Sequence, residues 1–522
     1  MTDEAAITAW LERRFGGPVL SLVRQPRWRP GWRAVVQQGA DSLRLFIRGD
    51  RGQGYSYPLE REARVLRLLE DHQIPVPHVY GMIDRPLAIV MDDVPGCGQL
   101  TGVTDPSEQR TIVDQYLGHL VRVHQVPLES VAAAGLEIPA TREEVQLGFH
   151  GDRTRRYRAL KARPEPLVEF VMRWLARNVP LHRARTCLAV KDAGQFLVHD
   201  GRVTAIYDLE IAHVTDPQAD LSGMRVRNAF EPLGDLAYLF RRYTDLSGDP
   251  VDVHTVNFHQ MVGGLAGRQA ITRLRTEARA DYVTYLGWEI AGGCSVLSAL
   301  AEELGEELDR TPPDYDDTGE LLSSSLRASL SSWTAPSAPY DEGRTQSLLA
   351  HASLVLRRNP SLTNRYLDDV GKLLGARPRS AAHADAELEA FVVSAGPEWD
   401  HELLHLLHRH VQRSRAVFPD VDPSTAGAGD PGPHLDRFYL EPVRSVLARD
   451  AGRRAGSGRR PLRADQPVER GLRRSPGAAP RHAHRPAAPV GRQRAPRGQP
   501  DPPLGQPARP CPAAAAARAG YG

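Results

Sequence analysis

Six polar side chains of the kinds that bind cations or transfer protons lie within one stretch, CLAVKDAGQFLVHDGRVTAIYDLEIAHVTDPQADL, residues 187–221. They are Asp192, Gln195, Asp208, Glu210, Asp216 and Asp220. Clustered carboxylates repel one another unless a cation or a shared proton offsets the repulsion. The segment therefore predicts a site that binds a metal ion or transfers a proton.

A β-hairpin is expected to position this cluster. Residues 195–199 and 202–207 are rich in strand-forming types, and the Asp-Gly pair between them favours a two-residue turn. Such a turn sets the register, so that residue 199 faces 202, 195 faces 206 and 193 faces 208. Asp208 then lies at the open end of the hairpin, on the same face as Gln195. Asp192, in the bend before the first strand, lies at that end too.

The segment resembles the catalytic region of the aminoglycoside phosphotransferase-like family, relatives of protein kinases that phosphorylate hydroxyl groups of small molecules. In that family a His-Gly-Asp segment is followed by an Asn, and an Asp ends the next hairpin. By match of position, the resemblance implies that Asp192 is the catalytic base and that Gln195 and Asp208 hold magnesium. Residues 216–221, DPQADL, resemble the family's Gly-Asp-Pro-x-x-Asp-Leu segment, whose second Asp supports the catalytic loop.

The chain departs from the family pattern in this loop. Val190 and Lys191 stand where the family has His and Gly, and the amide is a Gln three residues after the base instead of an Asn about five residues after it. The chain looks closest to a divergent branch with an Asp-x-Gly-Gln bend. Lys191, one of three lysines in the chain, is a candidate catalytic point charge for a phosphate. A solvated loop lysine is the alternative.

The resemblance implies an α+β, bilobal protein kinase-like fold, with a small antiparallel β lobe containing one helix and a larger, mostly helical lobe. Strand-like runs agree with the small lobe, at residues 19–23, 33–37, 43–48 and 87–91. Residues 59–71 read as a helix with Glu62 on its apolar stripe. An inward carboxylate needs a cationic partner, and the resemblance implies Arg48, which would also clamp nucleotide phosphates. A solvated Glu62 is the alternative.

Two further segments bear on nucleotide binding. Residues 89–96, IVMDDVPG, resemble the hinge between lobes, which implies that Met91, Asp92 and Asp93 lie where backbone groups meet adenine. Residues 24–32, RQPRWRPGW, contain one glycine and two prolines. This loop therefore cannot present backbone N–H groups to phosphates as a glycine-rich loop does. Either its arginines bind phosphates through their side chains, or the loop caps the site.

The 522 residues leave room for several parts. We predict an N-terminal nucleotide-binding lobe at 1–95, a C-terminal catalytic lobe at 96–310, a helical appendage at 311–445 and a disordered Arg/Pro/Ala-rich tail at 446–522. The appendage either packs on the large lobe or mediates self-association. His401, His405 and His408 share one face of a predicted helix, for which ordinary packing is favoured over a metal site.

Composition narrows the partners and the compartment. No apolar run is long enough to span a bilayer, and the N-terminus lacks a signal pattern, so no membrane association is expected. Four scattered cysteines without a CxxC pair favour the cytoplasm. From Ala448 onward there are sixteen arginines against four acidic residues. Such a basic tail could bind nucleic acid by neutralising phosphates. Because it lacks interleaved aromatic residues and an RGG pattern, a nucleic-acid partner is not expected.

Together these features predict a phosphotransferase that uses ATP or another nucleoside triphosphate with Mg²⁺ and acts on a hydroxyl of a small molecule. A catalytically weak kinase-like binding module is the alternative, favoured by Val190, Gln195 and the glycine-poor loop. A metal-dependent hydrolase is a third hypothesis, but it does not explain the helix of Glu62 or the hinge. Aminoglycosides, macrolides, sugars and amino alcohols all remain open as acceptors.

Overall fold

The computed structural model describes residues 2–25, 29–50, 58–271, 282–317, 325, 339–419 and 432–456. The small lobe is built on one antiparallel sheet with the strand order β1-β2-β3-β5-β4. Its strands are β1 (Val19–Arg24), β2 (Gly31–Gln38), β3 (Asp41–Gly49), β4 (Val79–Asp84) and β5 (Leu87–Asp92). The four strand-like runs predicted for this lobe are therefore present, with β4 in addition.

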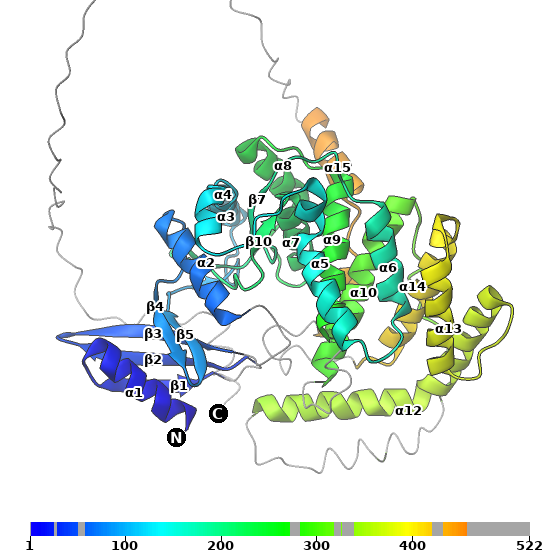
Figure 1. Cartoon of the computed structure of the whole chain (residues 1–522), viewed down its shortest axis with the longest axis horizontal. Helices are drawn as coiled ribbons and strands as arrows, with labels where there is room; N and C mark the ends of the chain where they lie inside the picture. The colour runs from blue at the N-terminus through cyan, green and yellow to red at the C-terminus, as the bar shows by residue number, and fades with distance from the viewer. Residues whose placement is uncertain are drawn as a thin grey trace, which may run out of the picture. The chain divides into compact units, whose positions relative to one another are not determined.

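Two helices cover opposite faces of this sheet (Figure 1). Helix α2 (Leu59–Asp71) has the predicted bounds, and its apolar residues pack with Ile89 and Met91. Helix α1 (Asp3–Phe15) packs Ile7 and Leu11 against the other face. The prediction of a single helix in this lobe was wrong, because α1 is present in addition to α2. Only Ile7 and Leu11 of α1 are buried, so its apolar periodicity is a weak signal in the sequence.

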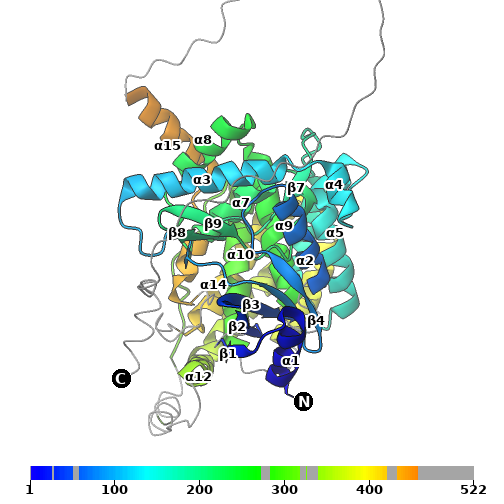
Figure 2. The ribbon, with the colours of Figure 1, turned by 90° about the vertical axis from the view of Figure 1, so that its left-hand side faces the viewer.

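The large lobe is mostly helical. Its helices are α3 (Pro106–His124), α4 (Leu128–Ala133), α5 (Arg142–Leu160), α6 (Pro166–Arg177), α7 (Gln218–Arg227), α8 (Leu236–Ser247), α9 (Val253–Ile271) and α10 (Tyr282–Leu304). Two small sheets lie among them, one of β6 (Cys97–Gly98), β8 (Phe196–His199) and β9 (Arg202–Ile206), the other of β7 (Cys187–Ala189) and β10 (His213–Thr215). Figure 2 shows α3 running past the β8–β9 pair, which it contacts through β9. The predicted bilobal α+β fold is confirmed.

The segments after the large lobe pack on it. They are α12 (Pro339–Leu374), α13 (Ala381–Ser394), the 3₁₀ helix η2 (Pro397–Trp399), α14 (Asp400–Ala416), the 3₁₀ helix η3 (Gly432–Phe438) and α15 (Val443–Gly456). Val370, Leu388 and Leu407 share one apolar cluster with Phe170 and Leu297 of the large lobe. The appendage thus shares its core with the large lobe, while self-association stays a prediction.

The histidines of α14 make packing contacts. His401 and His405 each contact one carboxylate oxygen of Glu306, at 2.7 Å and 3.1 Å. His408 is buried and lies 2.9 Å from the Tyr439 hydroxyl. Across the described parts of the chain, no group of three or more His, Cys, Asp or Glu side chains is arranged to hold a metal ion. None of the described helices has the length and apolarity needed to cross a bilayer.

Candidate active site

The acidic hairpin comprises the bend at residues 190–195, strands β8 and β9, and the loop at 207–210. Its turn was predicted correctly, because Asp200 and Gly201 both have positive φ, 48° and 70°. The pairing of His199 with Arg202 was also predicted correctly. Positive φ at both central residues gives a turn whose twist matches that of the flanking strands. The Asp-Gly pair thus closes the hairpin as its residue types require.

A β-bulge shifts the register beyond the turn, where the prediction was wrong. Thr204 is the additional residue, because Val198 pairs with Val203 while residue 197 pairs with 205. The Thr204 hydroxyl donates to the Pro95 carbonyl at 3.0 Å, which joins the hairpin to the linker between lobes. Residue 206 consequently faces 196 instead of 195. Asp208 still follows the open end, where it adopts a left-handed φ of 61°.

The bend before β8 is held by contacts to its backbone. The carboxylate of Asp220, on α7, accepts from the Val190 and Lys191 amides at 3.1 Å and 2.6 Å. The Gly194 amide donates to the Tyr116 hydroxyl of α3 at 2.6 Å. Because α3 and α7 both belong to the packed core of the large lobe, these bonds fix the bend to a rigid support.

Asp192 lies in this bend with its side chain 38% exposed. Its Oδ1 is bound by the Arg227 guanidinium, and its Oδ2 accepts from Gln195 Nε2 at 2.8 Å. Burial raises the pKa of Asp192, while the Arg227 charge opposes the increase. A carboxylate that is oriented on both oxygens and still reached by solvent can accept a proton from a bound hydroxyl group.

Lys191 and Gln195 support the bend from different sides. The Lys191 ammonium is buried and donates to the His259 carbonyl of α9 at 2.9 Å. In this structure it thus supports the bend, and its role as a charge for a phosphate stays a prediction. Burial lowers the pKa of Lys191 to about 8. Gln195 is buried and presents its N–H group to Asp192. In this structure Gln195 therefore orients Asp192, and its role as a metal ligand stays a prediction.

The predicted ion pair of the small lobe is present in the structure. Arg48, near the end of β3, donates through Nε to Glu62 Oε2 of α2 at 2.9 Å, and both side chains are almost fully buried. The carboxylates around Arg48 raise its pKa further than burial lowers it. Burial raises the pKa of Glu62, and Arg48 opposes that shift. The interpretation of Glu62 as a solvated acid was wrong.

This ion pair reaches the acidic hairpin across the two lobes. Arg48 Nη2 binds the Asp208 carboxylate and lies 3.6 Å from Glu210 Oε2. Arg29, which was not singled out from the sequence, binds Glu210 and lies 3.8 Å from Glu62. Two arginines of the small lobe thus face three carboxylates, one from α2 and two from the hairpin. No pattern in the sequence distinguishes Arg29 from the other arginines of its loop.

The three hinge candidates lie at the end of β5. Met91 is buried in the core shared with α2. The amides of Asp92 and Asp93 donate to the carbonyls of His78 and Arg44, at 3.1 Å and 3.2 Å. Both amides are therefore used within the small lobe, and a contact of this segment with a nucleotide base stays a prediction.

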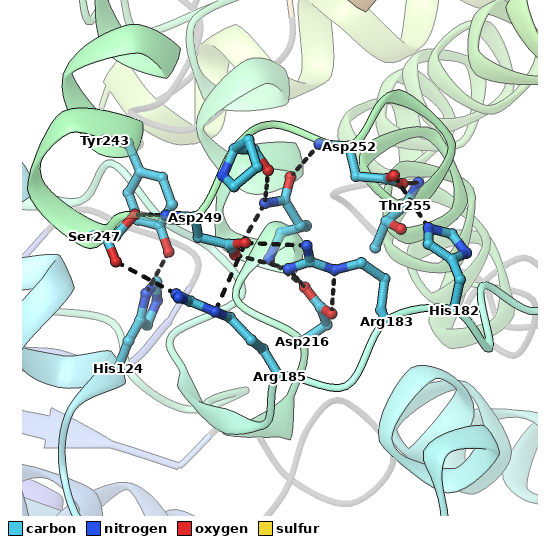
Figure 3. A network of polar contacts seen from close by, with 12 residues as sticks. His124, His182, Arg183, Arg185, Asp216, Tyr243, Ser247, Asp249, Asp252 and Thr255 are labelled. Carbon is cyan, nitrogen blue, oxygen red and sulfur yellow. Dashed lines mark hydrogen bonds and ion pairs between the residues drawn. The ribbon is translucent and has the colours of Figure 1, made fainter. Parts of the chain in front are cut away.

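An ionic network centred on Arg183 lies within the large lobe (Figure 3). Arg183 donates to both oxygens of Asp216, at 2.9 Å and 3.1 Å, and to both oxygens of Asp249, at 3.0 Å and 2.7 Å. Gln218 Nε2 donates to Asp249 at 3.2 Å. His124, on α3, contacts Asp220 at 2.9 Å. The second aspartate of DPQADL, Asp220, thus holds the bend through the Val190 and Lys191 amides, whereas Asp216 binds Arg183.

The remaining acids near the site are committed to structural contacts. Glu231 accepts from Arg227 Nη1 at 2.8 Å and from Gln99 Nε2 at 3.1 Å. Asp235 caps α8 by accepting from the Ala237 amide at 3.1 Å. The spacing of Arg227 and Glu231, four residues apart, is a signal that could have predicted their pairing. The contact of Arg227 with Asp192 has no such local signal.

Comparisons with known proteins found one matching family and several similar structures. The model of a family described as the phosphotransferase enzyme family matches residues 29–251. A macrolide 2'-phosphotransferase from Brachybacterium faecium is 21% identical, with 52% of this chain and 94% of that chain covered and a TM-score of 0.39. A thermostable mutant of an aminoglycoside phosphotransferase, in complex with ADP and hygromycin B, is 14% identical, with 51% and 91% covered and a TM-score of 0.40.

One curated relative also matches. Acyl-CoA dehydrogenase family member 10 of Mus musculus is 27% identical over 182 residues, which are 32% of this chain. The match spans only 16% of that mouse protein.

Proposed function

We propose that this chain, whose residues 29–251 belong to the phosphotransferase enzyme family, transfers a phosphoryl group from a nucleoside triphosphate to a hydroxyl group of a small molecule. The observation that carries the proposal is the meeting of two sets of residues at one place. The buried Arg48–Glu62 pair of the small lobe reaches the open end of the hairpin, where Asp208 follows β9 and Asp192 precedes β8. A phosphate clamp and a proton acceptor thus come from different lobes.

Asp192 is the residue proposed to receive the proton of the acceptor hydroxyl. Its two oxygens are oriented by Arg227 and Gln195, and each oxygen keeps a second lone pair for a substrate. Its raised pKa lies closer to that of an efficient base at neutral pH than the pKa of a solvated aspartate. Positioning of the hydroxyl by this carboxylate is the main chemical task, because phosphoryl transfer needs little covalent help.

The residues present suit a nucleotide with magnesium. Two buried guanidine nitrogens of Arg29 have no hydrogen-bond partner within the described ranges and suit phosphate oxygens. The Asp208 carboxylate, 26% exposed, is a hard oxygen donor of the kind that Mg²⁺ prefers. When bound, the magnesium nucleotide supplies the phosphoryl group and neutralises charge on its oxygens. Gln195 would join this set only if its amide turned its oxygen outward.

A catalytically weak binding module is the second candidate. The observation in its favour is that Asp192, Asp208 and Glu210 each contact a guanidinium in this structure. Carboxylates neutralised in this way can stabilise a fold without holding metal. The two candidates differ in whether a bound nucleotide is consumed.

Transfer of labelled γ-phosphate tests the proposal. The full chain, Asp192→Asn and the control Asp200→Asn would be incubated with ATP, Mg²⁺ and a panel of aminoglycosides, macrolides, sugars and amino alcohols. Asp200 lies in the hairpin turn with an 88% exposed side chain, and Asn tolerates its positive φ. We expect Asp192→Asn to lose about 10²- to 10⁴-fold in rate, while Asp200→Asn keeps the activity of the wild type.

Other outcomes separate the candidates. Nucleotide binding by the wild type without transfer to any acceptor would favour the binding module. Equal activity of Asp192→Asn and the wild type would remove Asp192 from the mechanism. Absence of both nucleotide binding and transfer would refute the proposal.

A further inference from the structure

Arg29 is a buried charged residue of the small lobe. It lies two residues before β2, within the glycine-poor segment 24–32, yet only 3% of it is exposed. Its Nη2 binds the Glu210 carboxylate, whereas its buried Nε and Nη1 have no hydrogen-bond partner among the residues that the structure describes. Buried N–H groups of a charged side chain are costly to leave without partners. The arrangement indicates that a bound ligand accepts hydrogen bonds from these N–H groups of Arg29.

Arg29 and Arg48 belong to one cationic unit. Both guanidiniums approach the same oxygen of Glu62, at 3.8 Å for Arg29 Nη1 and 2.9 Å for Arg48 Nε. Both also approach the same oxygen of Glu210, which Arg29 binds and which lies 3.6 Å from Arg48 Nη2. Two neighbouring planar guanidiniums present more N–H donors than the two oxygens of one carboxylate can bind. The several oxygens of a phosphate chain match this set of donors.

We infer that Arg29 and Arg48 together form the polyphosphate site of this chain, with Arg29 taking the place of the backbone N–H groups that a glycine-rich loop supplies. The inference rests on the proposed function, because it names the residue that holds the donor's phosphates. Without nucleotide, Glu210 and Asp208 serve as counter-ions of the two arginines. A polyphosphate takes over these N–H groups, and the Asp208 carboxylate becomes accessible to the metal ion.

The ligand class follows from the chemistry of the site. A single carboxylate ligand would gain little over Glu210, which already binds Arg29. A chain of two or three phosphates offers enough oxygens for both guanidiniums at once. Affinity should therefore depend on the number of phosphates more than on the base.

Binding constants for ATP, ADP and AMP with Mg²⁺ test the inference, measured by calorimetry on the full chain. We expect Arg29→Gln to weaken ATP binding about 10- to 100-fold, because charge-assisted hydrogen bonds to the phosphates are lost. AMP binding should weaken by less than about threefold. The control is Arg24→Gln at the end of β1, an exposed arginine on the other side of the same loop. This control should bind all three nucleotides as the wild type does.

Glu210→Gln provides a second measurement if Arg29→Gln fails to fold. Removal of the competing carboxylate should tighten binding of inorganic tripolyphosphate in the absence of metal by several-fold. An unchanged ATP affinity in Arg29→Gln, an equal loss for ATP and AMP, or weaker tripolyphosphate binding in Glu210→Gln would each overturn the inference.

Failure of the proposed function gives a different result. If Arg29→Gln shows the expected selective loss of ATP binding but the wild type transfers no phosphate, the inference stands and the function fails. If the wild type transfers phosphate and Arg29→Gln keeps its KM for ATP, the function stands and the inference fails.

Discussion

Helix α7 approaches the bend of Asp192 so closely at Gly223 that this glycine should control the position of the base. A Cβ atom added there would lie 3.0 Å from the Ala193 amide nitrogen and closer still to the Lys191 carbonyl oxygen. Both atoms belong to the backbone on either side of Asp192, so neither can rotate away as a side chain would. The Gly223→Ala substitution must therefore move the bend by about 1 Å to restore ordinary contact distances.

The consequences for stability and activity can be estimated separately. Overpacking costs about 1 to 3 kcal/mol, and weakening the bonds from Asp220 to the bend adds about 1 to 2 kcal/mol. Alanine returns about 1 kcal/mol through its higher helix propensity. We therefore expect a net loss of about 1 to 4 kcal/mol in the free energy of unfolding. A 1 Å displacement of the base should lower the rate of phosphate transfer about 100-fold.

The control is Gly118→Ala in α3, where an added Cβ meets nothing within 4 Å. This variant should gain about 0.5 to 1 kcal/mol and keep full activity. Urea unfolding and initial rates of transfer would be measured for both variants. If Gly223→Ala behaved like Gly118→Ala, the packing of α7 would not set the position of Asp192, and the argument from close approach would be refuted.

Three further predictions concern the support of the bend. The folded pKa of Lys191, about 8, lies below its unfolded value of 10.5, so the unfolded chain binds more protons between these values. Unfolding free energy measured from pH 8 to 10.5 should therefore rise by roughly 3 kcal/mol more in the wild type than in Lys191→Met. Lys191 has a φ of 66°, a conformation that glycine adopts more readily than alanine. Lys191→Gly should therefore be more stable in urea than Lys191→Ala by about 1 kcal/mol, whereas at most positions the alanine variant is the more stable one. A more stable Lys191→Ala would exclude a left-handed bend. Asp216→Asn removes two charge-assisted hydrogen bonds from Arg183, which keeps its ion pair with Asp249, and should cost about 1 to 3 kcal/mol in urea unfolding, whereas Asp200→Asn should cost almost nothing.

The elements with strong local signals could be predicted from the sequence. The Asp-Gly turn, the apolar stripe of α2 and the inward position of Glu62 follow from spacing alone, and the structure contains each of them. The partner of Glu62 required the resemblance, because nothing near Arg48 in the sequence marks it. The resemblance identified Arg48 because it implies a basic residue at this place in the strand, and Arg48 is such a residue.

The missed features depend on contacts between distant residues. The bulge at Thr204 follows from the hydroxyl contact to Pro95, which lies 109 residues earlier in the chain. The selection of Arg29 among the arginines of its loop follows from Glu210, 181 residues away. Propensity and periodicity describe neighbours within a few residues, so they carry no information on such pairs.

The departures of the loop from the family pattern do not remove its geometry. Lys191 holds a left-handed φ of 66° where the family has glycine, a conformation that strains a residue with a side chain. Its amide bond to Asp220 and its ammonium bond to the His259 carbonyl offset that strain. Val190, in place of the family's histidine, is buried in the core that also contains α3 and α7. A lysine and a valine thus hold this bend, so we expect the proposed activity to depend on the orientation of Asp192 more than on the identity of its two neighbours.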